Sequence, residues 1–369
     1  MNKMAHTPNL KATGTQAAAA SRQVEQSALM SGRALQERLL LGVSRTFALT
    51  IPQLPAALGN VISNHYLLCR IVDTIEDEPR LSPEQKRYFC DQFVDVARNG
   101  RRASQFAQEL APKLSEHTIA AEHELIRSTP AVIAVTLSFN QVQQAALARC
   151  VQVMTEGMVR FQQMKNPGGL KDLPQLNQYC YYVAGVVGET LTELFCEYSP
   201  AIAANRAKLM GLAVSFGQGL QMTNILKDVW DDHRRGACWL PQDVFDDTGF
   251  DLKNLAPEDY VDAFGLGLSR LIGIAQAHLD DAVSYTLLIP KHEKGIRSFC
   301  LWAIGFAVLT LRKINRHLDF STGNQVKISR RSVKSTILVT RLAMTHDRLV
   351  RSLFHLARQG LPTPPAQGA

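Results

Sequence analysis

Two short acidic segments contain the residues best suited to chemistry. They are Asp73-Thr-Ile-Glu-Asp77 and Asp228-Val-Trp-Asp-Asp232. In each, the outer aspartates are four residues apart, and a third acid, Glu76 or Asp231, follows the first aspartate by three. On a helix this spacing puts the three carboxylates on one side. Because like charges so close together repel, we expect a hard divalent cation with oxygen ligands, Mg²⁺ or Mn²⁺, to bridge them.

A solvated acidic helix face is the ordinary alternative for either segment alone. Apolar neighbours argue against it, because Leu67 to Ile71 precede the first segment and Met222 to Val229 surround the start of the second. A solvated face would have polar residues on most sides. We therefore expect both clusters at a cavity, with their carboxylates facing each other.

Mg²⁺ held in this way predicts a diphosphate ligand, because the ion completes its octahedron with water and phosphate oxygens. Metal-bound diphosphate is a good leaving group, since the ions neutralise the charge that develops as the carbon–oxygen bond breaks. Its departure would leave an allylic carbocation in an apolar tunnel.

Three cationic residues are candidates for diphosphate contact. Arg45, in Ser44-Arg-Thr-Phe47, carries a permanent charge suited to bidentate phosphate binding and lies beside an aromatic ring, Phe47. Arg70 and Lys227 lie next to the acidic segments. For each of these two, an ordinary cation on a helix surface is an equally good interpretation.

Polar residues also appear where a core helix should be apolar. Gln221 and Asn224 share one helical stripe with Asp228 and Asp232. A buried polar stripe without a ligand would leave unsatisfied groups, so the stripe indicates a site. The segment from Tyr179 to Gly188 mixes tyrosines with small residues, which serve either close helix packing or ligand space. A tyrosine there either fills the core or donates and relays a proton.

Other kinds of site are not supported. No Walker A, H-E-x-x-H or G-x-S-x-G pattern occurs, and Gly217-Gln-Gly219 lacks the third glycine of a dinucleotide fingerprint. The seven cysteines are scattered without a C-x-x-C pair. They predict reduced cytosolic thiols and neither a disulfide framework nor a zinc site.

The elements that position these residues are expected to be helices. Apolar residues recur at three- and four-residue spacing, and no alternating strand pattern with a hairpin turn is found. Prolines and glycines separate these stretches. The sequence predicts an all-α fold, with long helices over Ala34 to Leu49, Val61 to Ile75, Ala145 to Met164, Asn205 to Trp230, and Ala263 to Leu287.

Composition predicts flexible tails at residues 1–33 and 361–369 and a single all-α domain over residues 34–360. The net charge of +7 favours anionic partners, but basic residues form only short doublets such as Arg330-Arg331, which argues against nucleic acid. The longest apolar run, Phe299 to Leu311, fits a buried helix better than a membrane span. Without a secretory signal, we expect a cytoplasmic protein.

Taken together and in order, these segments resemble the squalene/phytoene synthase family of head-to-head prenyltransferases. The resemblance runs from about Ser44 to Ser335. Its markers are Ser44 to Phe47, Tyr66 with Arg70 and the first acidic segment, Tyr179 to Gly188, and Gln221 to Asp232. It implies an isoprenoid-synthase helical bundle around a central cavity.

The resemblance also implies residue roles. Two farnesyl diphosphates would bind in one cavity and condense to presqualene diphosphate, with Tyr182 matching the family tyrosine of this first half-reaction. Diphosphate or metal-shell positions are matched by Arg45, Tyr66, Arg70, Gln221 and Asn224. Mg²⁺ would be held by the aspartates of both segments, Asp73, Asp77, Asp228 and Asp232, with Glu76, Asp231 and Asn224 beside them.

Within the family, three segments resemble the branch that makes squalene, a reaction that needs NADPH. They are Tyr179 to Phe195, Ser298-Phe-Cys300, and the basic segment that begins at Val326. The resemblance implies that Phe299 lines the cavity and that Lys327, Arg330 and Arg331 bind NADPH. Lys227, where the family often has Arg, and the segment from Asp232 to Pro241 lean towards phytoene synthases. Two alternatives remain open: Phe299 only fills the core, and the basic residues only form a solvated patch.

Several outcomes stay open at this point. The product is squalene if hydride is delivered, and dehydrosqualene, phytoene or presqualene diphosphate if it is not. A helical membrane-surface protein without chemistry is the alternative from another class. Peripheral association with the inner face of a membrane is open, since a C30 hydrocarbon must leave into lipid. The sequence does not reveal the oligomeric state, for which a monomer is the default expectation.

Overall fold

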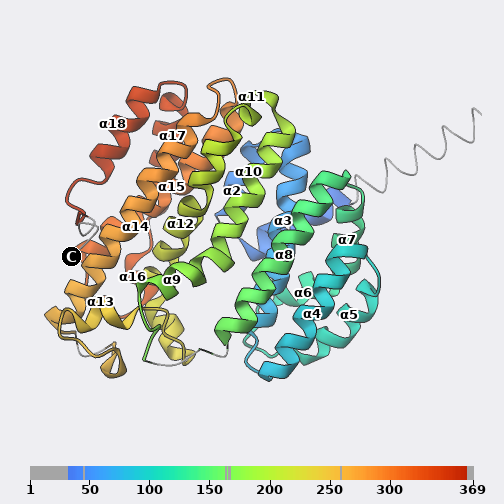
Figure 1. Cartoon of the computed structure of the whole chain (residues 1–369), viewed down its shortest axis with the longest axis horizontal. Coiled ribbons are helices and arrows are strands. Elements are labelled where there is room, and N and C mark those ends of the chain that lie inside the picture. Colours follow the sequence, from blue (N-terminus) through green and yellow to red (C-terminus); the bar gives the residue numbers. More distant parts are fainter. Residues whose placement is uncertain (1–31, 45, 163, 165–167, 258–259, 364–369) are drawn as a thin grey trace, which may run out of the picture.

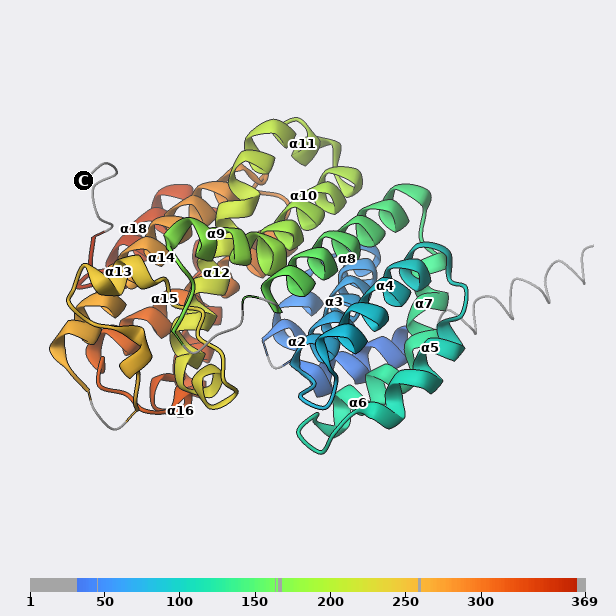
Figure 2. The same ribbon diagram turned by 60° about the horizontal axis from the view of Figure 1, so that its bottom comes forward.

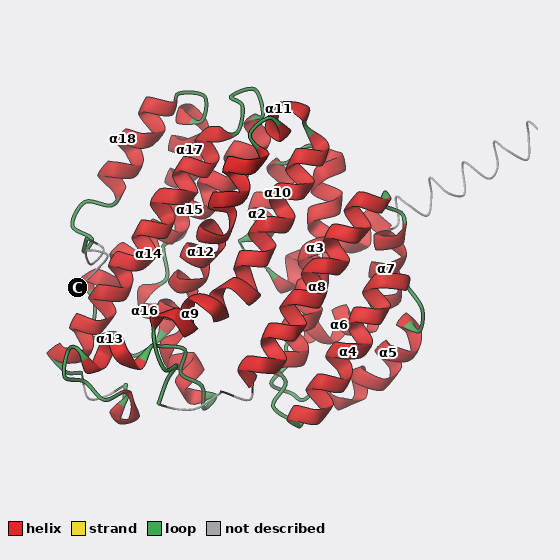
Figure 3. Ribbon diagram, in the orientation of Figure 1, coloured by secondary structure: helices red, strands yellow, loops and turns green. Residues whose placement is uncertain are grey.

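The computed structural model describes residues 32–44, 46–162, 164, 168–257 and 260–363. These residues are mostly helical, and their only β-type pairing is an isolated bridge between Leu170 and Pro241. The predicted all-α fold class is confirmed (Figure 3). Of the predicted tails, residues 1–31 and 364–369 lie outside the described part of the chain, whereas residues 32 and 33 already belong to a helix.

The first half of the chain forms the helices drawn from blue to green in Figure 1. Helix α3 is the longest of this group together with α8, and it ends in the first acidic segment. After a helix at residues 32–43, the elements are α2 (Phe47–Thr50), η1 (Ile51–Gln53), α3 (Ala56–Asp77), α4 (Pro83–Asn99), α5 (Ala103–Leu110), η2 (Ala111–Lys113), α6 (Ala120–Arg127), α7 (Thr129–Leu137) and α8 (Gln141–Gln162).

The second half contributes the longest helices. Helix α12 carries the second acidic segment near its C-terminal end. The elements are α9 (Leu173–Cys180), the π-helical turn η3 (Tyr181–Gly185), α10 (Val186–Tyr198), α11 (Pro200–Ala203), α12 (Arg206–Arg234), α13 (Gln242–Asp246), η4 (Leu252–Asn254), α14 (Asp262–Leu288), α15 (Lys294–Arg316), α16 (Gly323–Val326), α17 (Arg330–Ala343) and α18 (Asp347–Ala357).

Four of the five predicted helical stretches fall on α3, α8, α12 and α14. The fifth, Ala34 to Leu49, is not one helix, because the first helix ends at residue 43 and α2 begins at Phe47. The Ser44 hydroxyl accepts a hydrogen bond from the Phe47 backbone N–H at 3.0 Å. This hydrogen bond joins the end of the first helix to the first residue of α2, whose N-cap, Thr46, makes no capping bond of its own.

Turn chemistry explains where α4 begins and ends. Ser82 and Gln85 form a reciprocal capping box at its start, and Pro83 occupies the first turn, where no backbone donor is needed. Gly100 ends the helix with φ of +71°, a left-handed conformation that glycine adopts without steric cost.

Helix α15 contains the predicted buried run Phe299 to Leu311. Among the described residues it is the one helix long and apolar enough to cross a membrane, and 78% of its apolar window is buried inside the molecule. Its side chains join both apolar clusters of the core. The expectation of a core helix is therefore confirmed.

The core consists of two apolar clusters. One is built mainly from α3, α4, α5, α7 and α8 with part of α10, and the other mainly from α12, α14 and α15. Figure 2 shows α3 to α8 on one side of the molecule and α13 to α18 on the other. Helices α3, α10, α12 and α15 meet between these groups and enclose a cavity.

Candidate active site

A cavity of about 540 Å³ lies between α3, η3, α10, α12 and α15, a size typical of small-molecule sites. Carboxylates and cations line it where α3 and α12 end, whereas aromatic and aliphatic side chains line it toward the first halves of these helices. From Ile62 to Asp77, at 1.5 Å per residue, α3 forms about 22 Å of its wall. The cavity is therefore elongated, with an acidic end and an apolar end.

The two acidic motifs meet at the acidic end. The lining includes Asp73, Glu76 and Asp77 from α3 and Asp228 and Asp232 from α12. Arg235, just after α12, joins them, because its guanidinium lies 2.6 Å from an Asp232 oxygen and 3.6 Å from an Asp77 oxygen. A single cationic group thus spans both motifs, and the juxtaposition expected from the sequence is present.

Two half-buried carboxylates here, those of Asp73 and Asp232, are costly to ionise. Burial raises the pKa of Asp73 to about 7, with Asp77 adding to the shift and Arg70 opposing it. Burial also raises the pKa of Asp232 to about 6, although the Arg235 contact opposes the shift. Crowded carboxylate oxygens in a partly dry site are a donor set suited to Mg²⁺, whose charge would offset this cost.

Arg70 and Lys227 both line the cavity and contact the acidic motifs. Arg70 is ion-paired with Glu122 of α6 and lies 3.5 Å from Asp73. Burial works to lower the Arg70 pKa, but these two carboxylates outweigh it and raise the value. The Lys227 ammonium lies 3.1 Å from Asp228 and donates to the Asn224 side chain at 3.3 Å. These contacts favour a site over a solvated helix surface.

Aromatic rings form much of the apolar end. Phe47 lies 5.0 Å from Tyr66 and 6.5 Å from Phe299 between ring centroids, and Phe195 packs against Phe299 edge-on at 6.3 Å. The Tyr66 hydroxyl donates to the Val43 carbonyl at 3.4 Å, and burial raises its pKa. Because aromatic faces attract cations, this wall suits a carbocation.

The small residues in this region serve packing and ligand space together. A Cβ atom on Gly188 would lie 2.2 Å from the Ala213 carbonyl oxygen, and one on Gly217 would lie 2.2 Å from that of Ala184. The backbones of η3, α10 and α12 therefore approach closely. All four residues also line the cavity, so both interpretations of the small residues apply.

The structure brings a different tyrosine to the cavity than the sequence suggested. Tyr182 is not among the lining residues. Its ring packs on Gly157 of α8, and its ring centroid lies 6.2 Å from that of Phe161. Tyr179 lines the cavity, is 6% exposed and stacks on Trp239 at 4.1 Å. Burial and the charges of Glu76 and Asp232 raise the Tyr179 pKa. Tyr179 therefore lines the same cavity as both acidic motifs.

Four other predicted residues also lie outside the cavity lining. Asp231 is ion-paired with Arg234 and is not among the lining residues, although its carboxylate, like that of Asp228, lies beside Gly323. Lys327, just after α16, and Arg330 and Arg331, at the start of α17, are exposed. Arg45 lies outside the described residues. The remaining predicted residues line one cavity: Phe47, Tyr66, Arg70, Asp73, Glu76, Asp77, Gln221, Asn224, Lys227, Asp228, Asp232 and Phe299.

Sequence reasoning missed Tyr179 and Arg235, although each carries a signal. Tyr179, Val183, Val187 and Leu191 recur at four-residue spacing, which places them on one helical face, and all four line the cavity. Arg235 follows Asp232 by three residues, a spacing at which side chains on a helical turn meet.

The sequence profile described as squalene/phytoene synthase matches residues 40–332, which include both acidic motifs and Tyr179. The chain belongs to the squalene/phytoene synthase family. The matched residues include the whole cavity lining, from Phe47 to Ala303.

Named members of the family resemble this chain. Squalene synthase ERG9 of Gibberella zeae is 29% identical over 301 residues, which are 80% of this chain and 62% of that protein. The solved structure of TcSQS with the ligand E5700 superposes with a TM-score of 0.73 at 20% identity, covering 92% and 93% of the two chains. The solved structure of a dehydrosqualene synthase superposes with a TM-score of 0.58 at 19% identity, covering 90% of this chain and 99% of that one.

The chain spans between 60% and 66% of the length of the first curated relatives it matches. The isoprenoid-synthase bundle expected for this family is confirmed by the structural likeness. That likeness extends to a squalene synthase and a dehydrosqualene synthase alike, so the fold does not select the product.

Proposed function

We propose that this member of the squalene/phytoene synthase family is a squalene synthase. It condenses two farnesyl diphosphates to presqualene diphosphate and rearranges that product to squalene with hydride from NADPH. The observation that carries the proposal is one elongated cavity with carboxylates from two helices at one end and aromatic rings at the other. The identity to curated squalene synthases over most of the chain supports the same activity.

In this proposal Mg²⁺ binds at the acidic end. Asp73 and Asp77 from α3 and Asp228 and Asp232 from α12 would hold it, with the Asn224 amide oxygen and Glu76 within the same lining. Bound Mg²⁺ supplies neutralisation of the charge that develops on the diphosphate leaving group. Arg70, Lys227 and Arg235 orient the diphosphate and share that charge.

The apolar end holds the isoprenoid chains and excludes water. Phe47, Phe195 and Phe299 present ring faces and edges to the chain, and a carbocation beside them is stabilised and protected from water. The Tyr179 hydroxyl oxygen, on a side chain that lines the same cavity as Glu76 and Asp232, relays the proton that is lost when the cyclopropane closes. Tyr182, which packs against α8, orients this segment.

NADPH is proposed to bind beside α16 and the start of α17. Gly323 of α16 packs against Asp231 and Asp228, so this short helix lies next to the acidic end. Lys327, Arg330 and Arg331 follow it, and all three are exposed. Guanidinium groups suit the phosphates of NADPH. Replacing Arg330 and Arg331 with Ala should raise the KM for NADPH while leaving the rate of presqualene diphosphate formation unchanged.

Product analysis tests the proposal directly. Purified protein is incubated with farnesyl diphosphate and Mg²⁺, with and without NADPH, and the extract is resolved by gas chromatography and mass spectrometry. Squalene that forms only with NADPH supports the full two-step reaction. Presqualene diphosphate or dehydrosqualene in both reactions would reassign the chain within the family, and no product with any prenyl diphosphate would favour a role without chemistry.

We further propose that the protein is cytoplasmic and associates with an anionic membrane surface through α17 and α18. Leu338 and Leu342 of α17 and Leu356 of α18 are 62%, 69% and 59% exposed. The same two helices carry exposed basic residues, including Lys334, Arg348 and Arg351. Apolar side chains rimmed by basic residues are typical of a helix that lies in a lipid interface.

A further inference from the structure

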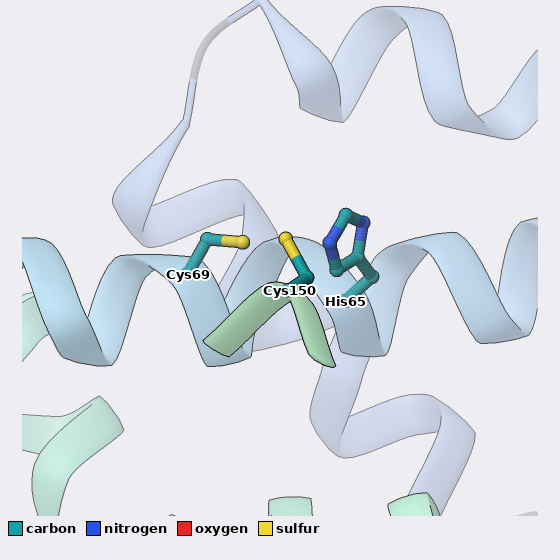
Figure 4. A group of neighbouring side chains, drawn as sticks. All are labelled: His65, Cys69 and Cys150. Carbon is teal, nitrogen blue, oxygen red and sulfur yellow. The ribbon is translucent and has the colours of Figure 1, made fainter. Parts of the chain in front are cut away.

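Three side chains outside the acidic motifs converge in the wall between α3 and α8. They are His65 and Cys69 of α3 and Cys150 of α8, with exposures of 2%, 8% and 0%. One imidazole nitrogen and the two sulfur atoms all lie within 4.8 Å of one another. Figure 4 shows the two sulfurs and the imidazole ring pointing toward one another from the two helices.

This cluster is polar but incompletely satisfied. The Nε2 atom of His65 is buried and has no hydrogen-bond partner among the described residues. A buried polar atom left in this state costs about 1–3 kcal/mol, so native proteins rarely leave one without a reason. Contact with Cys69 is the main factor that lowers the pKa of the Cys150 thiol. A thiolate beside an imidazole is the ligand chemistry of a soft metal ion.

We propose that His65, Cys69 and Cys150 form a binding site for Zn²⁺. The ion would take one imidazole nitrogen and two sulfurs, and two thiol protons would leave to solvent as the two Zn–S bonds form. His65 and Cys69 line the cavity whereas Cys150 does not. The fourth coordination position therefore faces the cavity.

The position of the cluster links it to the acidic motif. His65, Cys69, Asp73 and Asp77 follow one another at four-residue intervals along the same face of α3. A zinc ion held also by Cys150 would fasten this face to α8, close to the helix end that carries Asp73 and Asp77. The sequence hid the site, because the two cysteines are 81 positions apart in the chain and no C-x-x-C pair marks it.

Cobalt substitution tests the site without relying on turnover. The whole purified protein is reduced, freed of metal and titrated with Co²⁺ under anaerobic conditions in excess Mg²⁺, which occupies the carboxylates. We expect one equivalent of Co²⁺ to produce a thiolate-to-cobalt charge-transfer band that Zn²⁺ abolishes. Carboxylate-bound Co²⁺ gives no such band, so a failure of this site is distinguishable from a failure of the proposed Mg²⁺ site.

Matched variants assign the band to its ligands. Cys69→Ala and Cys150→Ala should each remove it, whereas Cys180→Ala, which alters an equally buried cysteine in the other apolar cluster, should retain it. In the unmutated protein, Zn²⁺ should also protect Cys69 and Cys150 from alkylation, as read by peptide mass spectrometry. Absence of the band, its persistence in the Cys69 and Cys150 variants, or a Cys69–Cys150 disulfide in glutathione buffer would overturn the proposal.

Discussion

At the scale of single residues, the acidic end holds carboxylates in an unfavourable state. Burial raises the pKa of Asp73 to about 7, so the charged form is costly unless a cation lies beside it. Proteins often accept such a cost at functional sites, where stability is given up for chemistry. A residue that supplies a metal ligand can therefore be distinguished from one that supports the fold.

Asp73→Asn should separate these two roles. We expect turnover at a fixed Mg²⁺ concentration to fall on the order of 10²–10³-fold, several kcal/mol, because a carboxylate ligand is lost. The melting temperature without Mg²⁺ should be unchanged or higher, since a costly buried charge is removed. Steady-state kinetics and thermal unfolding measure the two effects. Asp231→Asn is the matched control, because Asp231 lies outside the cavity lining; equal losses in both variants would contradict this assignment.

The tyrosine pair gives a second prediction at this scale. Tyr179→Phe keeps the ring that stacks on Trp239 but removes the hydroxyl at the cavity. We expect presqualene diphosphate formation to fall by about 10²–10⁴-fold, the usual loss when a proton-transferring group is removed. Tyr182→Phe should change the rate only a few-fold. The reverse order of effects in a single-turnover assay would show that Tyr182 enters the cavity during the reaction.

At the scale of elements, the close approach of α12 to η3 depends on a glycine. A Cβ on Gly217 would meet the Ala184 carbonyl oxygen at 2.2 Å, whereas one on Gly211, in the same helix, would meet nothing within 4 Å. Gly217→Ala should destabilise the protein by about 1–3 kcal/mol through overpacking. Gly211→Ala should stabilise it by about 0.5–1 kcal/mol, since alanine favours a helix. Chemical denaturation measures both; equal changes in the two variants would argue against close backbone packing.

Helix α18 is fastened to α15 by a buried guanidinium. Arg297 has no exposed surface, and it donates to Asp347 of α18 at 2.6 Å and to the Ile289 carbonyl at 3.3 Å. Burial opposes the charge on Asp347, but Arg297 and then Lys291 outweigh it and lower the pKa of this carboxyl. The pair therefore contributes stability in its ionised form.

Because the folded pKa of Asp347 is depressed, its contribution is fully present above the unfolded value, about 3.9, and is lost as the pH falls through the folded value. Asp347→Asn should lower the free energy of unfolding by about 3 kcal/mol at pH 7. This is the low end of the range for a broken buried ion pair, because the Asp347 side chain is 37% exposed. The difference in stability between the variant and the unmutated protein should shrink below pH 4. Melting temperatures across pH 3–7 measure it, and a constant difference would contradict the assignment.

Helical periodicity was sufficient to predict α3, α8, α12 and α14, because each long helix buries a continuous apolar face. It could not predict the break at Ser44, where the Ser44 side chain accepts a hydrogen bond from Phe47, because apolar residues continue at helical spacing across it. The acidic clusters were readable because their spacing is local. The contacts of Arg235 with Asp77, and of Cys69 with Cys150, join distant segments, and only the packing of α3 against its neighbours reveals them.

At the scale of the whole molecule, both apolar clusters contribute to one cavity. Phe195 and Phe299 come from the first cluster, and Ile225 and Trp239 come from the second, yet all four line the same space. Neither cluster would enclose the site alone. We therefore propose that residues 34–360 form one domain, with a single cooperative unfolding transition expected by calorimetry.

Charge is distributed very unevenly over this domain. Eight of the forty Lys and Arg residues follow Val326, together with only one of the thirty-three Asp and Glu residues, so this segment carries a net charge of +7. The preceding 326 residues therefore carry no net charge. The net positive charge of the protein is therefore concentrated on the segment that forms α17 and α18, which also exposes the leucines.

This asymmetry predicts that the protein binds anionic vesicles through one surface. Reversing Lys334, Arg348 and Arg351 to Glu should weaken binding on the order of 100-fold or more, since each basic residue near an anionic surface contributes about 1 kcal/mol. Reversing Arg87, Arg101 and Lys113, exposed residues of the α4 to η2 region, changes the net charge equally and should have little effect. Flotation with anionic and zwitterionic vesicles measures both. Equal losses in the two triple variants would indicate attraction by net charge alone, and no binding by the unmutated protein would exclude a membrane role for α17 and α18.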